Sequence, residues 1–287
     1  MKILVIGHSV EDHIHHDNEE EVKPGGIYYS VLGLSKIITA DDEIHLVTAL
    51  QKSSEHLFSD VYNKINKKNI SWVDEIPRVH LIIHDSEERS ECYENVSQNL
   101  VVDYEILSGF DGILVNMITG FDITLEQLQE IRKHFKGLIY FDVHTLSRGF
   151  DESKTRGFRQ IENFSQWASS VDLIQANESE VRTLFHLDSE LEIAAEILKR
   201  GTKYLIVTKG QLGAHAYYQR NNEIESIYSP VEKVRVNNKV GCGDIFGSVF
   251  FYNYLTTQNV KESLAAANHA AGQSASVKNL NELILKT

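Results

Sequence analysis

Short apolar stretches rich in β-branched residues alternate along the chain with longer stretches of helical period. The apolar stretches predict core strands at Lys2–Ile6, Glu43–Val47, Gly112–Val115, Gly137–Phe141, Asp172–Gln175 and Lys203–Val207. The stretches between them predict helices, among them Tyr28–Ile38, Leu125–Phe135, Leu191–Lys199 and Ile245–Leu255. Strands that alternate with helices form βαβ crossovers, which build a largely parallel sheet. We therefore expect an α/β fold with a central sheet and helices on both of its faces.

One region departs from this alternation. Between residues 78 and 100, two candidate strands, Val79–His84 and Cys92–Val96, flank the polar segment Asp85–Glu91, and no helical period is present. This pattern is typical of an antiparallel pair added to the main sheet. We expect one domain over residues 1–287, with this pair as an insertion.

Composition narrows the class of protein. Hydrophobic residues make up 42% of the 287 residues, which is enough for a large core. Two cysteines cannot form a disulfide framework, and no apolar run approaches the ~20 residues of a membrane span. The first strand is too short for a signal peptide, so we expect a cytoplasmic protein that does not act at a membrane. A net charge of −13 disfavours nucleic acid as a partner, although glycines and free amides can still bind an anionic cofactor.

Polar and glycine residues gather immediately after the predicted strands. They are His8–Asp12, Asn116, Asp142–His144, Asn177–Glu180 and Thr208–Gly213. In an open α/β sheet, ligands bind at the carboxyl ends of the strands. Each turn alone could be an ordinary strand end, but five of them together favour a binding site.

The segment Gly241-Cys242-Gly243-Asp244, followed by an apolar run, carries the most specific chemistry. Its glycines would lie at the start of a buried helix, where free N–H groups bind anions. Asp244 could then act as a base toward a hydroxyl, or it could simply favour the helix dipole from the first turn. A P-loop motif is absent, and a GxGxxxG spacing near the C-terminus argues against a dinucleotide-binding Rossmann enzyme.

Across essentially its whole length, the sequence resembles the PfkB/ribokinase family of carbohydrate and nucleoside kinases. Gly241–Asp244 match the end of the family's DTxGAGD signature, in which the last Asp is the catalytic base. The family's substrate elements match Gly7 to Asp12 and Pro24-Gly25-Gly26. Its N-x-x-E element matches Asn177–Glu180. Its nucleotide-binding positions match Thr208, Gly210, Gly213 and Asn268.

This resemblance implies a ribokinase-like fold and an ATP-dependent kinase that phosphorylates a hydroxyl of a small sugar, polyol or nucleoside. It implies that Asp244 is the base and that the amides of Gly241, Cys242 and Gly243 form the anion hole. Asp12, Gly25 and Gly26 would hold the substrate. Asn177, Glu180, Thr208, Gly210, Gly213 and Asn268 would serve ATP, with Glu180 holding Mg²⁺ indirectly. The 78–100 strands, with part of 9–24, would form a lid, and two such lids could pair in a homodimer.

The chain also departs from the family pattern. Asn238-Lys239 replaces the family's Asp-Thr, Cys242 replaces an Ala, and the amide of the GGxxxN element is replaced by Ser30. Ser30 therefore stands at a substrate position, and Asn116 is a weaker substrate candidate. The departures bear on which sugar is bound and on the family's monovalent-cation site. Two alternatives stay open, namely a catalytically silent sensor of a sugar or nucleoside, and a different α/β enzyme with a phosphorylated ligand.

Two further features have both a functional and an ordinary interpretation. His13, His15 and His16 suggest a metal site only if another segment supplies a further ligand, and a polar loop is the simpler expectation. Arg148 could reach a phosphate, or it could be a surface arginine.

Overall fold

The computed structural model describes the chain except residues 17–18, 83–89, 97, 151–155 and 286–287. A nine-stranded sheet, in the order β15-β14-β13-β12-β9-β8-β1-β4-β5, forms its centre. The strands are β1 (Lys2–Ile6), β4 (Glu43–Leu50), β5 (Ile70–Trp72), β8 (Gly112–Asn116), β9 (Leu138–Asp142), β12 (Leu173–Asn177), β13 (Tyr204–Thr208), β14 (Ala214–Arg220) and β15 (Glu223–Ser229). Only β14 and β15 run antiparallel to their neighbours. The predicted α/β class with a mostly parallel sheet is confirmed.

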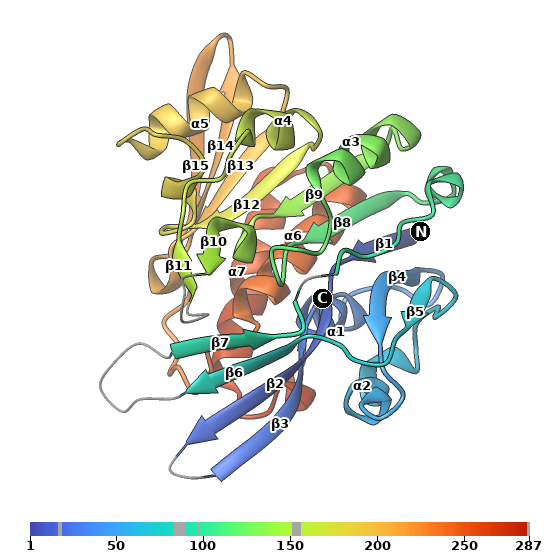
Figure 1. The fold of residues 1–287 in the computed structure, drawn as a ribbon. Helices are drawn as coiled ribbons and strands as arrows, with labels where there is room; N and C mark the ends of the chain where they lie inside the picture. Colours follow the sequence, from blue (N-terminus) through green and yellow to red (C-terminus); the bar gives the residue numbers. More distant parts are fainter. Residues whose placement is uncertain (17–18, 83–89, 97, 151–155, 286–287) are drawn as a thin grey trace.

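Helices cover the sheet on two sides (Figure 1). Helices α3 (Leu125–His134), α4 (Phe164–Ser169) and α5 (Glu190–Leu198) lie on one side, and α1 (Tyr28–Ser35), α6 (Cys242–Thr257) and α7 (Val260–Ser276) lie on the other. Helix α2 (Glu55–Tyr62) packs beside α1. Helix α6 is buried along most of its length, because α1, α7 and the sheet surround it. Its apolar sequence follows from that position.

A second sheet extends from the carboxyl edge of the first. It has the order β3-β2-β6-β7, with β2 (Ser9–His16), β3 (Glu19–Gly26), β6 (Arg78–Ile82) and β7 (Ser90–Glu94). Strand β2 follows β1 after only two residues, so the N-terminal segment supplies half of this sheet, which we call the lid. The sequence predicted a loop at His13–His16. This prediction is wrong, since these residues lie in β2. Part of the predicted strand Val79–His84 falls outside the described residues. The assignment of residues 1–287 to a single domain stays a prediction.

The two faces of the lid differ in character. Val10, Asp12, Val79 and Leu81 face the main domain and are buried, because alternate residues of a strand point to opposite sides. The opposite face carries His13 and His80, which are paired in register between β2 and β6. The lid thus has one face toward a cavity and one face away from it.

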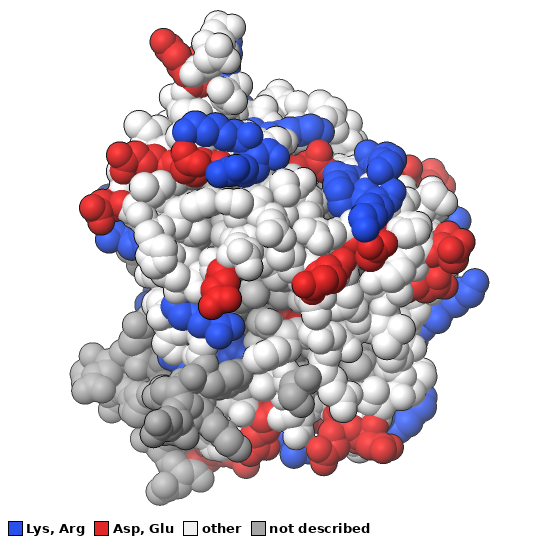
Figure 2. Space-filling model, turned by 45° about the horizontal axis from the view of Figure 1, so that its top comes forward, with Lys and Arg blue, Asp and Glu red and all other residues white. Residues whose placement is uncertain are grey.

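Charged side chains of both signs lie on the surface of the protein. On the face shown in Figure 2, acidic and basic side chains lie interspersed among uncharged ones. Among the helices of the described residues, none combines the length and hydropathy that crossing a membrane requires.

Candidate active site

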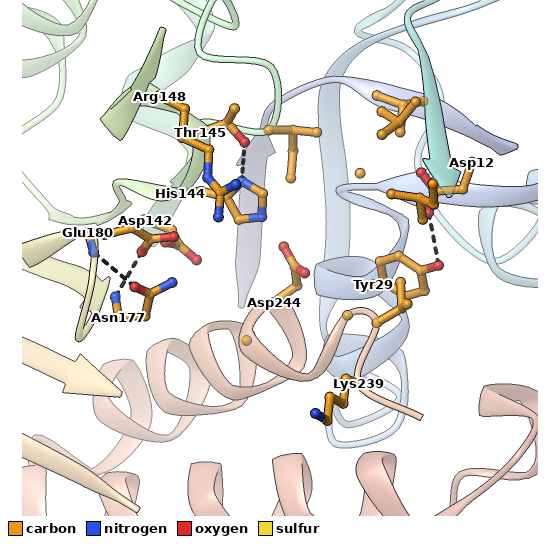
Figure 3. Close-up of a pocket in the computed structure, with 18 of the residues that line it drawn as sticks. Asp12, Tyr29, Asp142, His144, Thr145, Arg148, Asn177, Glu180, Lys239 and Asp244 are labelled. Carbon is orange, nitrogen blue, oxygen red and sulfur yellow. Dashed lines mark hydrogen bonds between the residues drawn. The ribbon is translucent and has the colours of Figure 1, made fainter. Parts of the chain in front are cut away.

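A cavity of about 220 Å³ lies between the lid and the carboxyl ends of β9, β12 and β13 (Figure 3). Of the residues that the sequence predicted for the site, this cavity brings together Asp12, Gly26, Asn177, Glu180, Thr208, Gly241, Gly243 and Asp244. They come from segments far apart in the chain. The position agrees with the general rule that ligands of open α/β sheets bind beyond the carboxyl ends of the strands.

Asp244 lies in the first turn of α6 and is held by a side chain from the sheet. Its Oδ1 accepts a hydrogen bond of 2.7 Å from Nδ2 of Asn116, at the end of β8. The same Nδ2 donates to Oγ of Ser30 at 3.2 Å, so Ser30 lies behind Asn116 and not on the cavity wall. Asn116 therefore orients the Asp244 carboxylate toward the cavity.

The glycines beside Asp244 expose the start of α6. Gly241 precedes the helix with φ of +76°, and a Cβ there would overlap the ring of Tyr29. A Cβ at Gly243 would meet no atom within 4 Å, so the backbone at this position is open to a ligand. The first N–H groups of a helix have no intrahelical acceptor and carry the positive end of the dipole. This helix start can therefore bind an anion.

Cys242 lies between these glycines, and its side chain is half-buried. Burial raises its pKa, and its Sγ lies 3.7 Å from the carbonyl oxygen of Asn238. A raised pKa leaves less of the thiol in the reactive thiolate form.

The opposite end of the cavity holds Asp12 on the inner face of the lid. The hydroxyl of Tyr29 donates to Oδ2 of Asp12 at 3.2 Å, and both side chains are buried. Burial and the nearby Asp12 charge raise the pKa of Tyr29 well above its ordinary value, so this hydroxyl stays a donor. Gly25 lies against the Asp12 carboxylate, where a Cβ would overlap it, and Gly26 has φ of +65°. The two glycines thus bring backbone close to Asp12.

Asp142 and Glu180 lie on the other side of Asp244 from Asp12 (Figure 3), and the charges of these three carboxylates interact. Asp142 ends β9, Glu180 follows β12, and Asp244 completes the set. Burial raises the pKa of Asp142 well above its usual range, and the charges of Glu180 and Asp244 raise it further. Burial also raises the pKa of Glu180, although His144, Arg148 and a backbone N–H oppose this.

The turn that carries Glu180 is closed by its own hydrogen bonds. Oε2 of Glu180 accepts from the Asn177 backbone N–H at 2.8 Å, while Oδ1 of Asn177 accepts from the N–H groups of Ser179 and Glu180 at 2.9 Å each. Carboxylate oxygens are the ligands that Mg²⁺ prefers. A divalent cation would relieve the mutual repulsion of this cluster, so its donor set fits such an ion.

The predicted nucleotide positions are split between the cavity and its surroundings. Thr208 lines the cavity, whereas Gly210 and Gly213 follow it in a turn with φ of +53° and +87°. A Cβ at Gly213 would collide with the carbonyl oxygen of Ser229. Nδ2 of Asn268 donates to that same oxygen at 2.8 Å and so ties α7 to the end of β15.

Gln175 lines the cavity and was given no role from the sequence. Gln175 donates from Nε2 to Asp142 at 2.8 Å and to the Gly243 carbonyl at 3.2 Å, and its Oε1 accepts from the Tyr140 hydroxyl at 2.5 Å. It joins β9, β12 and α6, and nothing in the sequence distinguishes it from a core residue. Arg148, for which the sequence left a phosphate contact or a surface position open, lines the cavity near Glu180, where Figure 3 shows it beside His144.

Comparison with known proteins places the chain in a family. The sequence profile of the pfkB family carbohydrate kinases matches residues 123–287, which is more than half of the chain. The protein therefore belongs to the pfkB carbohydrate kinase family. The resemblance seen in the sequence is confirmed. No curated protein matches the chain by sequence.

Solved structures extend the similarity to the whole fold. Ribokinase of Arabidopsis thaliana, complexed with ribose and ATP, is 15% identical with a TM-score of 0.76, covering 100% of this chain and 99% of its own. A putative ribokinase II of E. coli, in complex with ATP and Mg²⁺, is 16% identical with a TM-score of 0.78, covering 99% and 95%. A pyrophosphate-dependent kinase of the ribokinase family, complexed with a pyrophosphate analog and myo-inositol, is 13% identical with a TM-score of 0.72, covering 99% and 100%. At these identities the likeness shows the ribokinase-like fold.

Proposed function

We propose that this protein is an ATP-dependent kinase that transfers the γ-phosphoryl group to a hydroxyl of a small sugar, polyol or nucleoside. The observation that carries the proposal is the position of Asp244. Its carboxylate lies at the open start of α6, in the same cavity as the buried carboxylate of Asp12. A base beside an anion site, facing a hydroxyl-binding group, is the arrangement that phosphoryl transfer to an alcohol needs.

The acceptor would bind against the lid. Asp12 accepts hydrogen bonds from substrate hydroxyls, and Tyr29 keeps one of its oxygens in place. Val79, Leu81 and Tyr93 form an apolar wall on the same side of the cavity, suited to the carbon face of a sugar ring. Closing the lid over the acceptor excludes water, which would otherwise compete as the nucleophile.

The donor would bind beyond Asp244. In the transfer step, Asp244 accepts the proton of the attacking hydroxyl, and the amides of Gly241, Cys242 and Gly243 stabilise the charge on the transferring group. Asp142 and Glu180 would hold Mg²⁺, with Glu180 acting through water. When bound, Mg²⁺ neutralises charge on the phosphates of ATP. Arg148, Lys239 and Thr208 also line the cavity and add donors for phosphate oxygens.

The test measures ADP release from ATP and MgCl₂ with a panel of sugars, polyols and nucleosides. Turnover with one acceptor, abolished in Asp244→Asn, supports the proposal. Since a relative of the same fold is pyrophosphate-dependent, pyrophosphate is run as an alternative donor in parallel. Transfer from pyrophosphate alone would overturn the choice of ATP. Saturable binding of an acceptor without transfer from either donor would identify the sensor. Pairing of two lids in a homodimer stays a prediction, checked by light scattering.

A further inference from the structure

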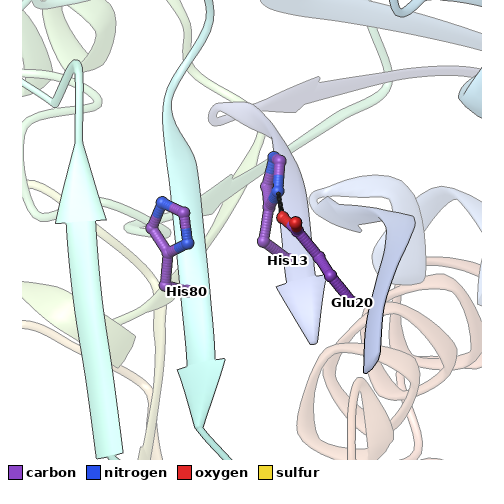
Figure 4. A group of neighbouring side chains, drawn as sticks. All are labelled: His13, Glu20 and His80. Atoms are coloured by element: carbon purple, nitrogen blue, oxygen red, sulfur yellow. Dashed lines mark hydrogen bonds and ion pairs between the residues drawn. The ribbon is translucent and has the colours of Figure 1, made fainter. Parts of the chain in front are cut away.

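The outer face of the lid, opposite the cavity, carries a cluster of metal-binding side chains. His13 on β2 and His80 on β6 are paired in register, and Glu20 on β3 lies two residues from Val22, the partner of His13. All three side chains point to the same face, because they differ from one another by an even number of positions in the ladder. Three strands therefore contribute one ligand each (Figure 4).

The distances within the cluster are close to those of a coordination site. One ligand atom from each of His13, Glu20 and His80 lies within 4.8 Å of the others. Nδ1 of His13 and Oε1 of Glu20 are 2.5 Å apart, and the His13 and His80 ring centroids are 5.0 Å apart. A tetrahedral zinc ion with bonds of about 2.0–2.1 Å places its ligand atoms about 3.3 Å from one another. The separations in the cluster, 2.5 Å for one pair and at most 4.8 Å for the others, lie on either side of that spacing.

We propose that this cluster binds a divalent transition metal of the zinc class. Two imidazoles and one carboxylate are a ligand set typical of Zn²⁺, and they leave a fourth position for water or a further side chain.

The surroundings favour a cation. His15 is the next histidine on the same face, and its Nε2 lies 3.0 Å from Nδ1 of His80, which fixes the orientation of that ring. Nε2 of His80 is buried and has no hydrogen-bond partner among the described residues, and Oε1 of Glu94, on β7, lies 3.6 Å from it. Oε2 of Glu11 lies 3.3 Å from Nε2 of His13 and 3.2 Å from Nε of Arg78. The carboxylates of Glu11, Glu20 and Glu94 outnumber the one guanidinium, that of Arg78. The cluster therefore lies in negatively charged surroundings.

A metal at this position would join β2, β3 and β6 of one chain. Asp12 lies next to His13 on β2 with its side chain on the opposite face, so the ion would brace the strand that carries the proposed acceptor-binding carboxylate. Binding requires neither nucleotide nor acceptor. The inference therefore stands or fails independently of the proposed kinase activity.

The experiment is a ZnCl₂ titration of the full-length, EDTA-treated protein, followed by calorimetry and by competition with a chromogenic chelator. We expect saturable binding of one zinc ion per chain and a zinc-dependent rise in Tm. We expect His80→Gln and Glu20→Gln each to weaken zinc binding at least about tenfold. Co²⁺ bound in place of zinc should show the visible bands of a site with nitrogen and oxygen ligands. The matched control is His134→Gln, because His134 lies on α3 beside Glu130, and the described residues supply no third ligand there.

Glu20 is exposed, so Glu20→Gln keeps the fold and its circular dichroism is compared with that of the wild type. The proposal is overturned if the wild type shows no saturable binding, or if both variants bind zinc as the wild type does. It is also overturned if His134→Gln loses as much affinity as they do. A stoichiometry of half a zinc ion per chain, accompanied by dimerisation, would show that two chains share the ion. This result would overturn the proposal that one chain supplies the site.

Discussion

At the scale of single residues, Asp244 is a carboxylate whose partner, Asn116, holds one oxygen while the group faces the cavity. Asp244→Asn keeps the shape of the side chain but cannot accept a proton. We expect kcat to fall about 10²–10⁴-fold, with nucleotide binding nearly unchanged, because the anion site is backbone. Steady-state kinetics and calorimetry with ATP measure the two effects.

The control for this variant is Glu262→Gln, which removes an exposed acidic residue from the first turn of α7. It should leave kcat unchanged. If Asp244→Asn also keeps a kcat near that of the wild type, Asp244 serves only the helix dipole.

Asp12 should govern recognition of the acceptor. A charged acceptor of hydrogen bonds contributes about 1.5–3 kcal/mol per bond, so Asp12→Ala should raise KM for the acceptor more than tenfold. The KM for ATP should change little. Tyr29→Phe removes the donor at 3.2 Å but keeps the ring against Gly241, and it should give a smaller rise. Equal loss of affinity for both ligands in Asp12→Ala would instead indicate a folding defect.

Lys239 should make the protein independent of potassium. The family resemblance implies a monovalent-cation site, but here Asn238 replaces the acidic residue and its Oδ1 accepts the Val240 N–H at 2.9 Å. Lys239 lines the cavity, and two unit charges about 4 Å apart repel by about 4 kcal/mol at an effective dielectric of 20. Activity should stay flat when potassium is exchanged for tetramethylammonium at fixed ionic strength. Severalfold activation by potassium would contradict this.

At the scale of elements, the start of α6 allows a paired test. Gly241→Ala forces a methyl group into the Tyr29 ring at a φ of +76°, and it should lower the free energy of unfolding by about 2 kcal/mol or more. Gly243→Ala meets no atom within 4 Å and should fold as the wild type does, but its methyl group would occupy the anion site. Denaturant unfolding and ATP binding measure the two effects. Equal stability of both variants would show that the helix start is not constrained as described.

The sequence predicted the main sheet because its parallel strands are covered on both faces and read as apolar runs. The more polar strand β3 contains no such apolar run, so the sequence did not predict it. Strand β3 begins with Glu19-Glu20-Glu21 and is exposed, so its pairing with β2 depends on backbone hydrogen bonds. The hairpin of β14 and β15 was also missed, although Asn221-Asn222, with φ of +50° and +65°, is a recognisable turn signal.

The residues of the candidate site also fall into two groups, those that local sequence patterns predicted and those that they did not. Residues that follow strands or lie in glycine-rich turns were found, because such positions are typical of ligand binding. Asn116 was found at a strand end, but its hydrogen bond to Asp244 spans 128 residues and depends on the packing of α6 against β8. Gln175 and Tyr29 act through contacts of the same kind. No local pattern reports such contacts.

At the scale of the whole molecule, the buried carboxylates should set how stability depends on pH. Asp142 has a raised pKa, so the folded state binds more protons than the unfolded state above pH ~4. Its contribution to stability is present below the unfolded pKa and is lost as pH rises through the folded pKa. The pKa of Asp122 is shifted in the opposite direction, below its ordinary value. Burial opposes its ionisation, but the His8 imidazole and backbone N–H groups lower its pKa, so its contribution is lost as pH falls.

Asp142→Asn should therefore stabilise the ligand-free protein at pH 8, with a smaller gain at pH 5. The Asn side chain can still accept the 2.8 Å hydrogen bond from Gln175, so the change removes charge and keeps the contact. Asp122→Asn, the control, should destabilise the protein at pH 8, because it removes a favourable buried charge beside His8. Denaturant unfolding at both pH values measures the difference, and Mg²⁺ with ATP should stabilise the wild type more than Asp142→Asn. Destabilisation by Asp142→Asn at pH 8 would mean that Asp142 is compensated within the folded chain, and the assignment of this cluster to a divalent cation would lose its support.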